Sequence, residues 1–545
     1  MKIAIAQLNF HIGNFESNTQ KMLEAIQQAK DKEADIICFS ELSTTGYPPR
    51  DFLEFDDFIH LAEESIEKLT EAAVGIAVVV GSPSRNPVPE GKDLFNSAYF
   101  LADGKVLHVQ HKSLLPTYDI FDEYRYFEPD KNWKVVEYRG KKIALTICED
   151  IWNIGNENPL YTVCPLDQMI DQKPDFILNL SASPFSFDQA DTRIEIVKAN
   201  VDRYKIPMFY VNHVGAQTAL IFDGGSLVVS PNGKIYEELP HFKEALKMYD
   251  LAEVEQGEKN RPYPKHKYAM IQDALILGIK DYFGKLGFTK AAVGLSGGID
   301  SAVTAALAAQ ALGPENVRCI LMPSHFSSDH SVEDAKKLAE NFGMPYDIIP
   351  IESVYHSYID LLKPTFEGQP FNLTEENIQA RVRGMILMAI SNKFGNIVLN
   401  TSNKSEAAVG YGTLYGDMCG GLSVIGDLYK TEVFELARFI NEEKEWIPEN
   451  TITKPPSAEL RPNQKDSDSL PDYDILDQIL YNYIEKRSDP QDIIAMGFDE
   501  AIVRRALRLV NTNEFKRYQT PPMLRISSKA FGMGRRMPIV GKYLS

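Results

Sequence analysis

A glycine-rich turn joins an apolar run to an amphipathic run in AAVGLSGGIDSAVTAALAA, residues 291–309. Two further apolar runs follow, at 317–323 and 346–351, with a helical pattern at 331–343 between them. Consecutive strand–helix–strand units predict a doubly wound parallel sheet, because each crossover returns over the sheet with a right-handed turn. The glycine-rich turn then lies at the carboxyl edge of the sheet, where such folds bind nucleotides.

The residues of this turn suit phosphate groups. Gly297 and Gly298 let backbone N–H groups approach an anion, and the helix N-terminus adds roughly half a positive charge. The turn matches neither the Walker loop G-x-x-x-x-G-K-[ST] nor the dinucleotide pattern G-x-G-x-x-G. In place of a lysine it carries Asp300, and a carboxylate beside phosphates is a typical oxygen ligand of Mg²⁺. We therefore expect phosphate groups and Mg²⁺ here; the alternative is a tight turn with Asp300 as a helix cap.

The string SGGIDS resembles the signature loop of the ATP pyrophosphatases, which split ATP between the α and β phosphates and adenylate a carboxylate or similar oxygen. Residues 376–417 and 457–480 resemble the NAD synthetase family more closely, and this resemblance covers the chain from about 265 onward. It implies ATP at Gly294, Leu295, Ser296, Gly297, Gly298, Ile299, Asp300, Ser301 and Thr401; metal at Asp300 and Glu406; and deamido-NAD at Asn377, Glu406, Tyr411, Gly412, Thr413, Leu414 and Lys516.

Two features of this half have more than one interpretation. Arg381 and Arg383 follow Asn377 on an expected helix, where a pair of arginines is otherwise typical of a solvated face. The stretch 454–474 is rich in proline, serine and charge, and is either a surface loop or a lid ordered by ligand.

The first 250 residues alternate apolar runs with amphipathic runs and end in hairpin-like segments, which predicts a mixed sheet. The stretch 255–268 is charged and contains two prolines, as a domain linker does. We expect one domain at 1–258 and a second at 265–545.

Three reactive residue types end three expected strands in the first half: Glu41, Lys112 and Cys148. Singly, the cysteine is typical of a core and the charged residues of a solvated strand end. Together they suit attack on an amide. Lys112 supplies the cation that a thiolate beside Glu149 and Asp150 needs, and Glu41 carries the proton from the thiol to the leaving ammonia.

The segments around these residues, SELSTTGYPPRD, HKSLLPTYDIFDEYRYFEP and ICEDIW, resemble the nitrilase superfamily and the glutaminase domain of glutamine-dependent NAD synthetases. The resemblance implies an α-β-β-α nitrilase-like sandwich followed by a Rossmann-like ATP-pyrophosphatase domain. It places glutamine at Tyr118, Glu123, Ser183 and Gln189. Where the family often has Lys or Arg, this chain has Gln189, so nearby Arg193 is a second candidate to bind the carboxylate of glutamine.

The resemblance implies an ATP-dependent amidation of deamido-NAD to NAD, with ammonia from glutamine and an adenylated intermediate, and with glutamate, AMP and pyrophosphate as by-products. Release from glutamine delivers NH₃ rather than ammonium, which cannot attack. The alternatives are a related glutamine-fed ligase acting on another nucleotide, a tRNA-modifying enzyme, and a nucleotide sensor without turnover.

Composition bears on partners and location. Lys+Arg number 57 and Asp+Glu 76, a formal charge of −19, which disfavours nucleic acid and anionic membranes as partners. The start lacks a secretory signal and no apolar run reaches 18 residues, so we expect a cytoplasmic protein. The five cysteines form no C-x-x-C pair. A homo-oligomer is expected from the family resemblance.

Overall fold

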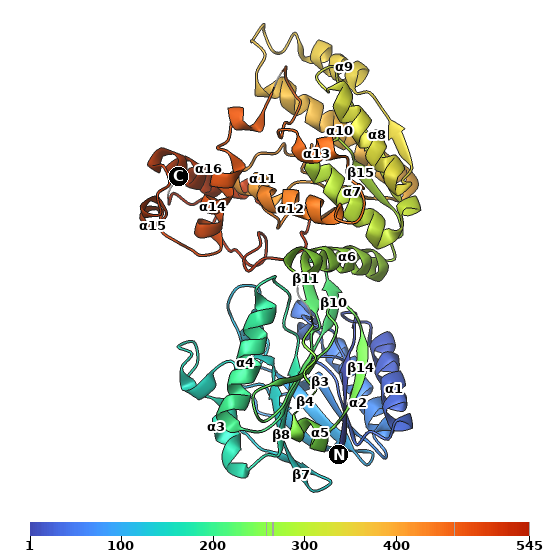
Figure 1. Ribbon diagram of the computed structural model, residues 1–545, viewed down its shortest axis with the longest axis vertical. Coiled ribbons are helices and arrows are strands. Elements are labelled where there is room, and N and C mark those ends of the chain that lie inside the picture. The colour runs from blue at the N-terminus through green and yellow to red at the C-terminus, as the bar shows by residue number, and fades with distance from the viewer. Residues whose placement is uncertain (258, 264–265, 463, 544–545) are drawn as a thin grey trace. The chain divides into compact units, whose positions relative to one another are not determined.

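The computed structural model describes residues 1–257, 259–263, 266–462 and 464–543, and it consists of two compact units, residues 1–265 and 266–545 (Figure 1). The expected domain ends at 258 and 265 fall on residues outside those described, so the boundaries proposed from the sequence stay a prediction.

The first unit contains two six-stranded sheets. In spatial order, the first sheet consists of β14 (Ala245–Asp250), β1 (Lys2–Gln7), β2 (Ile36–Cys38), β3 (Ala77–Arg85), β4 (Leu94–Ala102) and β5 (Lys105–His111). The second consists of β13 (Ile235–Glu238), β12 (Leu227–Val229), β9 (Met208–Asn212), β8 (Phe176–Ser181), β7 (Lys141–Ile147) and β6 (Val136–Tyr138). A separate hairpin pairs β10 (Val214–Gln217) with β11 (Leu220–Asp223).

Helices cover the outer face of each sheet in this unit (Figure 1). One apolar core joins the first sheet to α1 (Phe15–Asp31) and α2 (Asp56–Ala72), and another joins the second sheet to α3 (Pro165–Met169) and α4 (Gln189–Tyr204). A third core lies between the sheets. The predicted α-β-β-α sandwich is therefore confirmed, and both sheets are mixed, as β1 pairs parallel with β2 and antiparallel with β14.

The second unit is built on a five-stranded parallel sheet. Its spatial order is β17 (Tyr346–Ile348), β16 (Val317–Leu321), β15 (Ala291–Gly294), β18 (Ile397–Asn400) and β19 (Leu422–Ser423). The chain starts at the central strand β15, winds to one edge, and returns to the other side of β15. This confirms the predicted doubly wound sheet, whose strand order reverses beside β15.

The remaining helices have these bounds: α5 (Leu251–Gln256), α6 (Lys267–Leu286), α7 (Ile299–Leu312), α8 (Asp329–Phe342), α9 (Glu352–Leu362), α10 (Leu373–Phe394), α11 (Lys404–Val409), α12 (Lys430–Ile440), α13 (Glu449–Thr453), α14 (Tyr473–Ile484), α15 (Pro490–Ala495), α16 (Glu500–Thr512) and α17 (Glu514–Arg517). Short 3-10 helices are η1 (Arg50–Glu54), η2 (Glu123–Arg125), η3 (Cys148–Ile151), η4 (Ile154–Asn156), η5 (Ile170–Gln172), η6 (Pro314–Asn316) and η7 (Asp466–Asp468).

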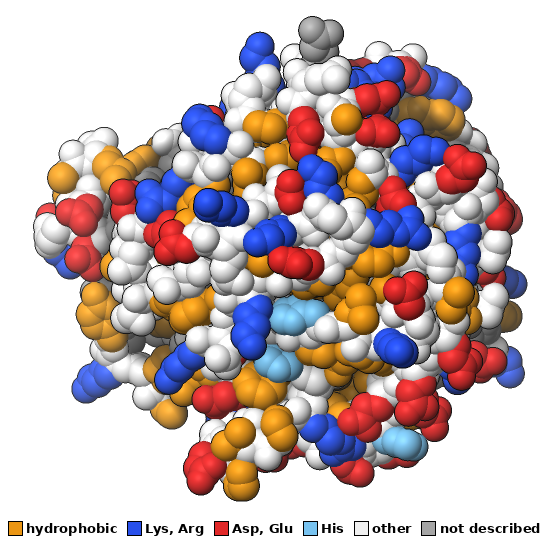
Figure 2. Space-filling view, turned by 90° about the horizontal axis from the view of Figure 1, so that it is seen from below, with side chains coloured by type: hydrophobic (Ala, Val, Ile, Leu, Met, Phe, Trp, Pro, Cys, Tyr) orange, Lys and Arg blue, Asp and Glu red, His pale blue; other side chains and the backbone are white. Residues whose placement is uncertain are grey.

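The surface mixes both signs of charge. On the face seen in Figure 2, Lys and Arg side chains are interspersed with Asp and Glu side chains. Within the described part of the chain, every helix is too short or too polar to cross a lipid bilayer.

Candidate active sites

The predicted phosphate turn leads from β15 to α7 at the carboxyl edge of the sheet. Gly297 has φ +81°, and a Cβ there would lie 2.1 Å from the carbonyl oxygen of Ser331 in α8, so only glycine fits. The other predicted residues of the turn, 294–296 and 298–301, line a cavity of about 620 Å³, as does Thr401. The turn thus faces open space on one side, and Gly297 packs against α8.

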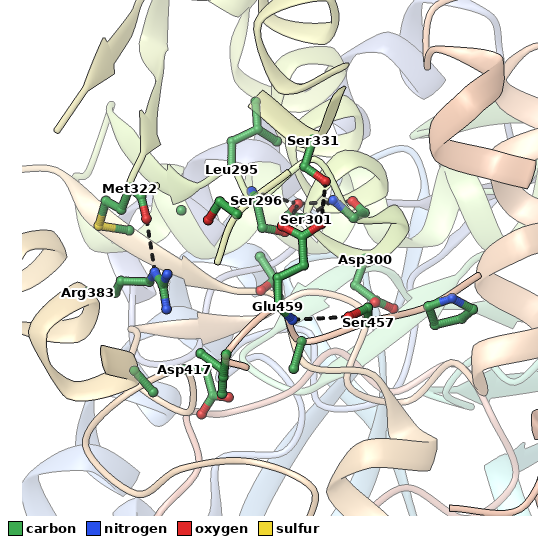
Figure 3. A pocket seen from close by; sticks show the side chains of 18 of the residues that line it. Leu295, Ser296, Asp300, Ser301, Met322, Ser331, Arg383, Asp417, Ser457 and Glu459 are labelled. Carbon is green, nitrogen blue, oxygen red and sulfur yellow. Dashed lines mark hydrogen bonds between the residues drawn. The ribbon is translucent and has the colours of Figure 1, made fainter. Parts of the chain in front are cut away.

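The cavity has an apolar and a charged region (Figure 3). Leu295, Met322 and Leu387 contribute to the apolar lining, and Arg383 donates from Nε to the carbonyl oxygen of Met322 at 3.0 Å. Burial lowers the pKa of Arg383 to about 10, which reflects a charge incompletely balanced inside the protein. Arg383 therefore does not lie on a solvated face, whereas Arg381 is exposed.

The charged region brings together both predicted metal ligands. Lys430 Nζ forms an ion pair with the Asp300 carboxylate and lies 3.5 Å from Glu406 Oε1. Asn403 links the two acids: its Nδ2 donates to Asp300 Oδ1 at 2.9 Å, and its Oδ1 accepts from the Glu406 N–H at 2.9 Å. Burial and the charge of Asp300 raise the pKa of Glu406 to about 8. The two carboxylates thus repel each other unless a cation lies between them.

This donor set fits Mg²⁺ in part. Mg²⁺ is usually held by one or two carboxylates together with phosphate oxygens and water. Among the described residues, no group of three or more His, Cys, Asp or Glu side chains could hold a metal ion alone. Asp300 and Glu406 therefore suit a metal that arrives with a phosphate ligand.

The stretch 454–474 lines the same cavity through residues 454–461 and 464–466; residue 463 lies outside the described part. Its main anchor is Glu459, whose Oε1 accepts hydrogen bonds from the hydroxyls of Ser328 and Ser331, each at 2.8 Å (Figure 3). These serines open α8, so the carboxylate lies at a helix N-terminus. Ordering of this segment by ligand stays a prediction.

The residues predicted to bind deamido-NAD form a second cluster. Thr413 Oγ1 donates to Asn377 Oδ1 at 2.7 Å, and Lys516 Nζ donates to the carbonyl oxygens of Gly410 and Gly412 at 2.7 and 2.8 Å. Arg381 Nε donates to the carbonyl oxygen of Leu414 at 3.2 Å. Tyr411, in the same turn, also lines the cavity. Segments far apart in the sequence thus meet beside the ATP-loop cavity.

In the first unit, Lys112 lies between two carboxylates. Its Nζ is 2.7 Å from Glu41 Oε1 and 2.8 Å from Glu123 Oε2, and the side chains of Lys112 and Glu41 are 0% exposed. Burial alone would lower the pKa of Lys112, but the charges of Glu123 and Glu41 raise it well above its usual range. Glu41 also accepts from Asn96 Nδ2 at 2.7 Å and from the Ala182 N–H at 3.0 Å. Glu41 and Lys112 are therefore a preorganised buried pair.

Cys148 follows β7 directly and has φ +44°, an uncommon conformation for a residue with a side chain. Burial and the charge of Glu41 raise the pKa of its thiol well above the usual range, although Lys112 opposes this. From the sequence, Glu41 is expected to take the proton of this thiol, with Lys112 as the cation beside the thiolate that forms. In the structure Lys112 pairs with Glu41 and Glu123, and the raised pKa favours the thiol at rest.

The candidate glutamine residues lie on separate segments of the first unit. Tyr118 donates from its hydroxyl to Glu149 Oε1 at 3.0 Å, Ser183 donates its N–H to Asn212 Oδ1 at 2.9 Å, and Gln189 begins α4. Arg193 is buried, pairs with Asp223 through both terminal nitrogens, and donates to the carbonyl oxygen of Ser183. Its guanidinium is thus already paired within the protein, and binding of the glutamine carboxylate by Gln189 or Arg193 stays a prediction.

Sequence reasoning missed several side chains at both sites. At the second site these are Lys430 and Glu459, which line the cavity, and Asn403, which donates to Asp300. Asn96 contacts Glu41, and Glu149, which accepts from Tyr118 and Tyr161, is 4% exposed beside Cys148. The only signal in the sequence was proximity: Asn403 and Glu149 lie within three residues of a predicted site residue.

Comparison with known proteins finds two family models. Residues 2–162 match carbon-nitrogen hydrolase, and residues 271–520 match NAD synthase. Among curated proteins, the chain is 47% identical to the glutamine-dependent NAD(+) synthetase of Synechocystis sp., over 98% of each chain. It is 44% identical to the protein of the same name from Acinetobacter baylyi, over 99% of this chain and 98% of that one.

Two solved structures are similar over nearly the whole chain. One is a glutamine-dependent NAD+ synthetase from Acinetobacter baumannii in complex with ADP, at 42% identity, a TM-score of 0.79, and coverage of 99% of this chain and 98% of that one. The other is a glutamine-dependent NAD(+) synthetase from Cytophaga hutchinsonii, at 22% identity, a TM-score of 0.86 and the same coverage, which bears on the fold alone.

Proposed function

Because this chain belongs to the glutamine-dependent NAD(+) synthetases, we propose that its two clusters of buried charged side chains are the two active sites of one ligase. The enzyme uses ATP to amidate deamido-NAD to NAD, through an adenylated intermediate, with ammonia released from glutamine. The observation that carries the residue assignment is the buried Glu41–Lys112 pair beside Cys148 in one unit and the Asp300–Glu406 pair in a cavity of the other. Similarity over both units favours this reaction over amination of another nucleotide.

In the first unit, Glu41 takes the proton of Cys148 as the sulfur attacks the carboxamide carbon of glutamine. Attack and proton transfer are coupled because the raised pKa of the thiol makes a free thiolate scarce. Lys112 stabilises the oxyanion of the tetrahedral intermediate. Glu41 then returns the proton to the leaving ammonia, which leaves a thioester on Cys148 that water hydrolyses to glutamate.

Glutamine is bound by Tyr118, Glu123, Ser183 and Gln189 in this proposal. We add Glu149, because its buried carboxylate next to Cys148 accepts only neutral hydroxyl donors, from Tyr118 and Tyr161, among the hydrogen bonds described here. Burial raises the pKa of Glu149, so a cationic partner would stabilise its charged form. The ammonium group of glutamine supplies such a partner.

In the second unit, the turn 294–301 and Thr401 bind ATP, and Asp300 and Glu406 hold Mg²⁺. When bound, Mg²⁺ neutralises phosphate charge and orients the pyrophosphate leaving group. Lys430 turns from these carboxylates to the phosphate oxygens. The residues Asn377, Glu406, Tyr411 to Leu414 and Lys516 bind deamido-NAD so that its nicotinate carboxylate attacks the α-phosphate. Ammonia then displaces AMP from the adenylate.

Two variants test this division of labour. Cys148→Ala abolishes NAD formation from glutamine, by at least about 10³-fold, and keeps formation from ammonium chloride. Asp300→Asn lowers both rates by about 10²-fold or more, because both routes need the adenylate. The control is Cys164→Ala, another buried cysteine of the first unit. Continued glutamine use by Cys148→Ala would show that the nucleophile is misassigned.

We also propose that the reaction takes place in the cytoplasm and that the chain forms a homo-oligomer. Family membership and the ATP and dinucleotide substrates support both proposals. Sedimentation velocity at micromolar concentration tests the second: a single species with the mass of one chain would contradict it.

A further inference from the structure

Asp150 lies two residues after Cys148 and takes no part in the chemistry proposed above. Its side chain is buried and accepts three backbone hydrogen bonds. Oδ1 accepts from the N–H groups of Ser113 and Leu114, each at 2.9 Å, and Oδ2 accepts from the N–H of Ile147 at 3.0 Å. The first two donors directly follow Lys112, and the third directly precedes Cys148.

These donors come from different sheets. Lys112 follows β5 at the edge of the first sheet, and Cys148 follows β7 in the second. Strand pairing sets positions within a sheet, but stacked sheets lie about 10 Å apart and are held together by side chains. The distance between the Lys112 ammonium and the Cys148 thiol therefore depends on contacts that cross between the sheets. Asp150 makes such a contact on both sides of the pair.

A second link of the same kind supports this reading of the geometry. Glu41 follows β2 of the first sheet, and its Oε2 accepts from the Ala182 N–H, which follows β8 of the second sheet. Each of the two charged catalytic side chains from the first sheet is thus tied to the second sheet by a buried carboxylate. For Glu41 the carboxylate is its own, and for Lys112 it is that of Asp150.

Burial makes the charged form of Asp150 costly. Burial raises its pKa to about 7, even though the N–H groups of Leu114 and Ile147 oppose the shift. A buried carboxylate without a paired cation is costly, and its hydrogen bonds do not fully offset the loss of water. A group that weakens the fold is retained where it determines the geometry of an active site.

We propose that Asp150 is a positioning residue for glutamine hydrolysis, whose carboxylate sets the separation between Lys112 and Cys148 across the two sheets. The inference rests on the proposed roles of Lys112 and Cys148. The described hydrogen bonds of Asp150 all come from backbone N–H groups, so we expect its loss to change the rate of the chemical step and to leave glutamine binding intact. A displacement of about 1 Å in such a site lowers the rate by about 10²-fold.

Asp150→Asn tests this in the full-length enzyme. The amide oxygen still accepts from Ser113 and Leu114, but the amide nitrogen faces the N–H of Ile147, donor to donor, which displaces the turn that carries Cys148. We expect kcat for glutamine hydrolysis to fall by about 10²-fold, with KM for glutamine changed by less than about threefold. Alkylation of Cys148 by iodoacetamide slows, and NAD synthesis from ammonium chloride is unchanged.

The matched control is Asp175→Asn. Asp175 accepts the N–H of Lys142 at 2.7 Å near the start of β7, so it anchors the same strand at the end away from Cys148. This control lowers Tm and leaves kcat within about threefold of the wild type. A purely structural role for Asp150 predicts the same result for Asp150→Asn and would overturn the proposal.

If Asp150→Asn does not fold, Asp150→Glu decides, because it keeps the charge and the acceptors but moves them by one methylene. A similar fall in kcat supports the proposal, and a kcat within about threefold of the wild type overturns it. Failure of the underlying assignment is distinguishable: Cys148→Ala would then still hydrolyse glutamine, whatever the Asp150 variants do.

Discussion

Lys112 in the first unit and Lys430 in the second each lie between two carboxylates, but the exposure of those carboxylates differs. The side chains of Lys112, Glu41 and Glu123 are 0%, 0% and 6% exposed. Lys430 is 3% exposed, but Asp300 and Glu406 are 17% and 16% exposed and line a cavity of about 620 Å³ with it. The same set of charges is almost fully buried in one unit and lines a cavity in the other.

This difference in exposure explains why the two lysines have different roles. Removing the Lys112 ammonium from the buried site leaves two unpaired carboxylates, which lowers the free energy of unfolding by about 3–5 kcal/mol. We therefore infer that Lys112 keeps its place through catalysis. In the cavity of the second unit, Mg²⁺ can take the place of the Lys430 ammonium beside Asp300 and Glu406. Lys430 can then pair with a phosphate oxygen. The exposure of the carboxylates thus decides whether the lysine stays in its ion pair during the reaction or leaves it when ligand binds.

The largest expected effect is that of Lys112→Met. Loss of the cation removes oxyanion stabilisation and leaves Glu41 and Glu123 facing each other, so NAD formation from glutamine falls by about 10³-fold or more. Thermal unfolding of the first unit shifts to lower temperature. Formation from ammonium chloride is retained, and its loss in folded protein would mean that Lys112 also serves the synthetase site.

Lys430→Met has a smaller effect. The proposed exchange predicts that kcat/KM for ATP falls by about 10²-fold with ammonium chloride as nitrogen donor, because a phosphate contact is lost. Glutamine hydrolysis measured alone is unchanged. Lys337→Met, which breaks an exposed pair with Glu445 in the same unit, is the control for loss of one charge. Equal kcat/KM in the two variants would remove Lys430 from the ATP site.

The smallest expected effect is a change in the pH dependence of Tm in Glu123→Gln. Burial raises the pKa of Glu123 from 4.5 to about 7, so the folded state holds this proton more tightly than the unfolded state. Its contribution to stability is complete below about pH 4.5 and is lost as pH rises to about 7. Glu123→Gln removes this loss. The difference in Tm of the first unit between the variant and the wild type is therefore about 2–4 °C more favourable to the variant near pH 7 than at pH 5.

The control is Glu67→Gln, on the exposed face of α2. Differential scanning calorimetry from pH 5 to 8 compares the two variants with the wild type. Parallel Tm profiles for all three proteins would contradict a raised pKa of Glu123. Asp150, whose pKa burial also raises to about 7, keeps part of the pH dependence in every variant.

Much of the fold could be predicted because the strands are short apolar runs with clear turns. The amphipathic run after the glycine-rich turn predicts a helix from the local sequence, and α7 lies there. The positions of Glu41, Lys112 and Cys148 after strands were also predictable, but β2 and β5 belong to the first sheet and β7 to the second, so the strand pattern alone does not bring the three residues together. Local pattern was sufficient wherever position relative to a strand end decides the outcome.

The rest depends on contacts between distant segments. Lys430 pairs with Asp300 across 130 positions, and Asn403 reaches Asp300 across 103, so no spacing in the sequence signals either contact. The second carboxylate partner of Lys112 was missed for a related reason. Pairing Lys112 with the thiol was reasonable in sequence, but Glu123, eleven positions away, takes up the same charge.

The most direct test of the two kinds of lysine is a crystal structure of Cys148→Ala with glutamine, Mg²⁺ and a non-hydrolysable ATP analogue. We expect Lys112 to remain within hydrogen-bond distance of Glu41, while Lys430 leaves Asp300 for a phosphate oxygen and Mg²⁺ contacts both Asp300 and Glu406. Lys430 still paired with Asp300, with the metal bound elsewhere, would contradict the account.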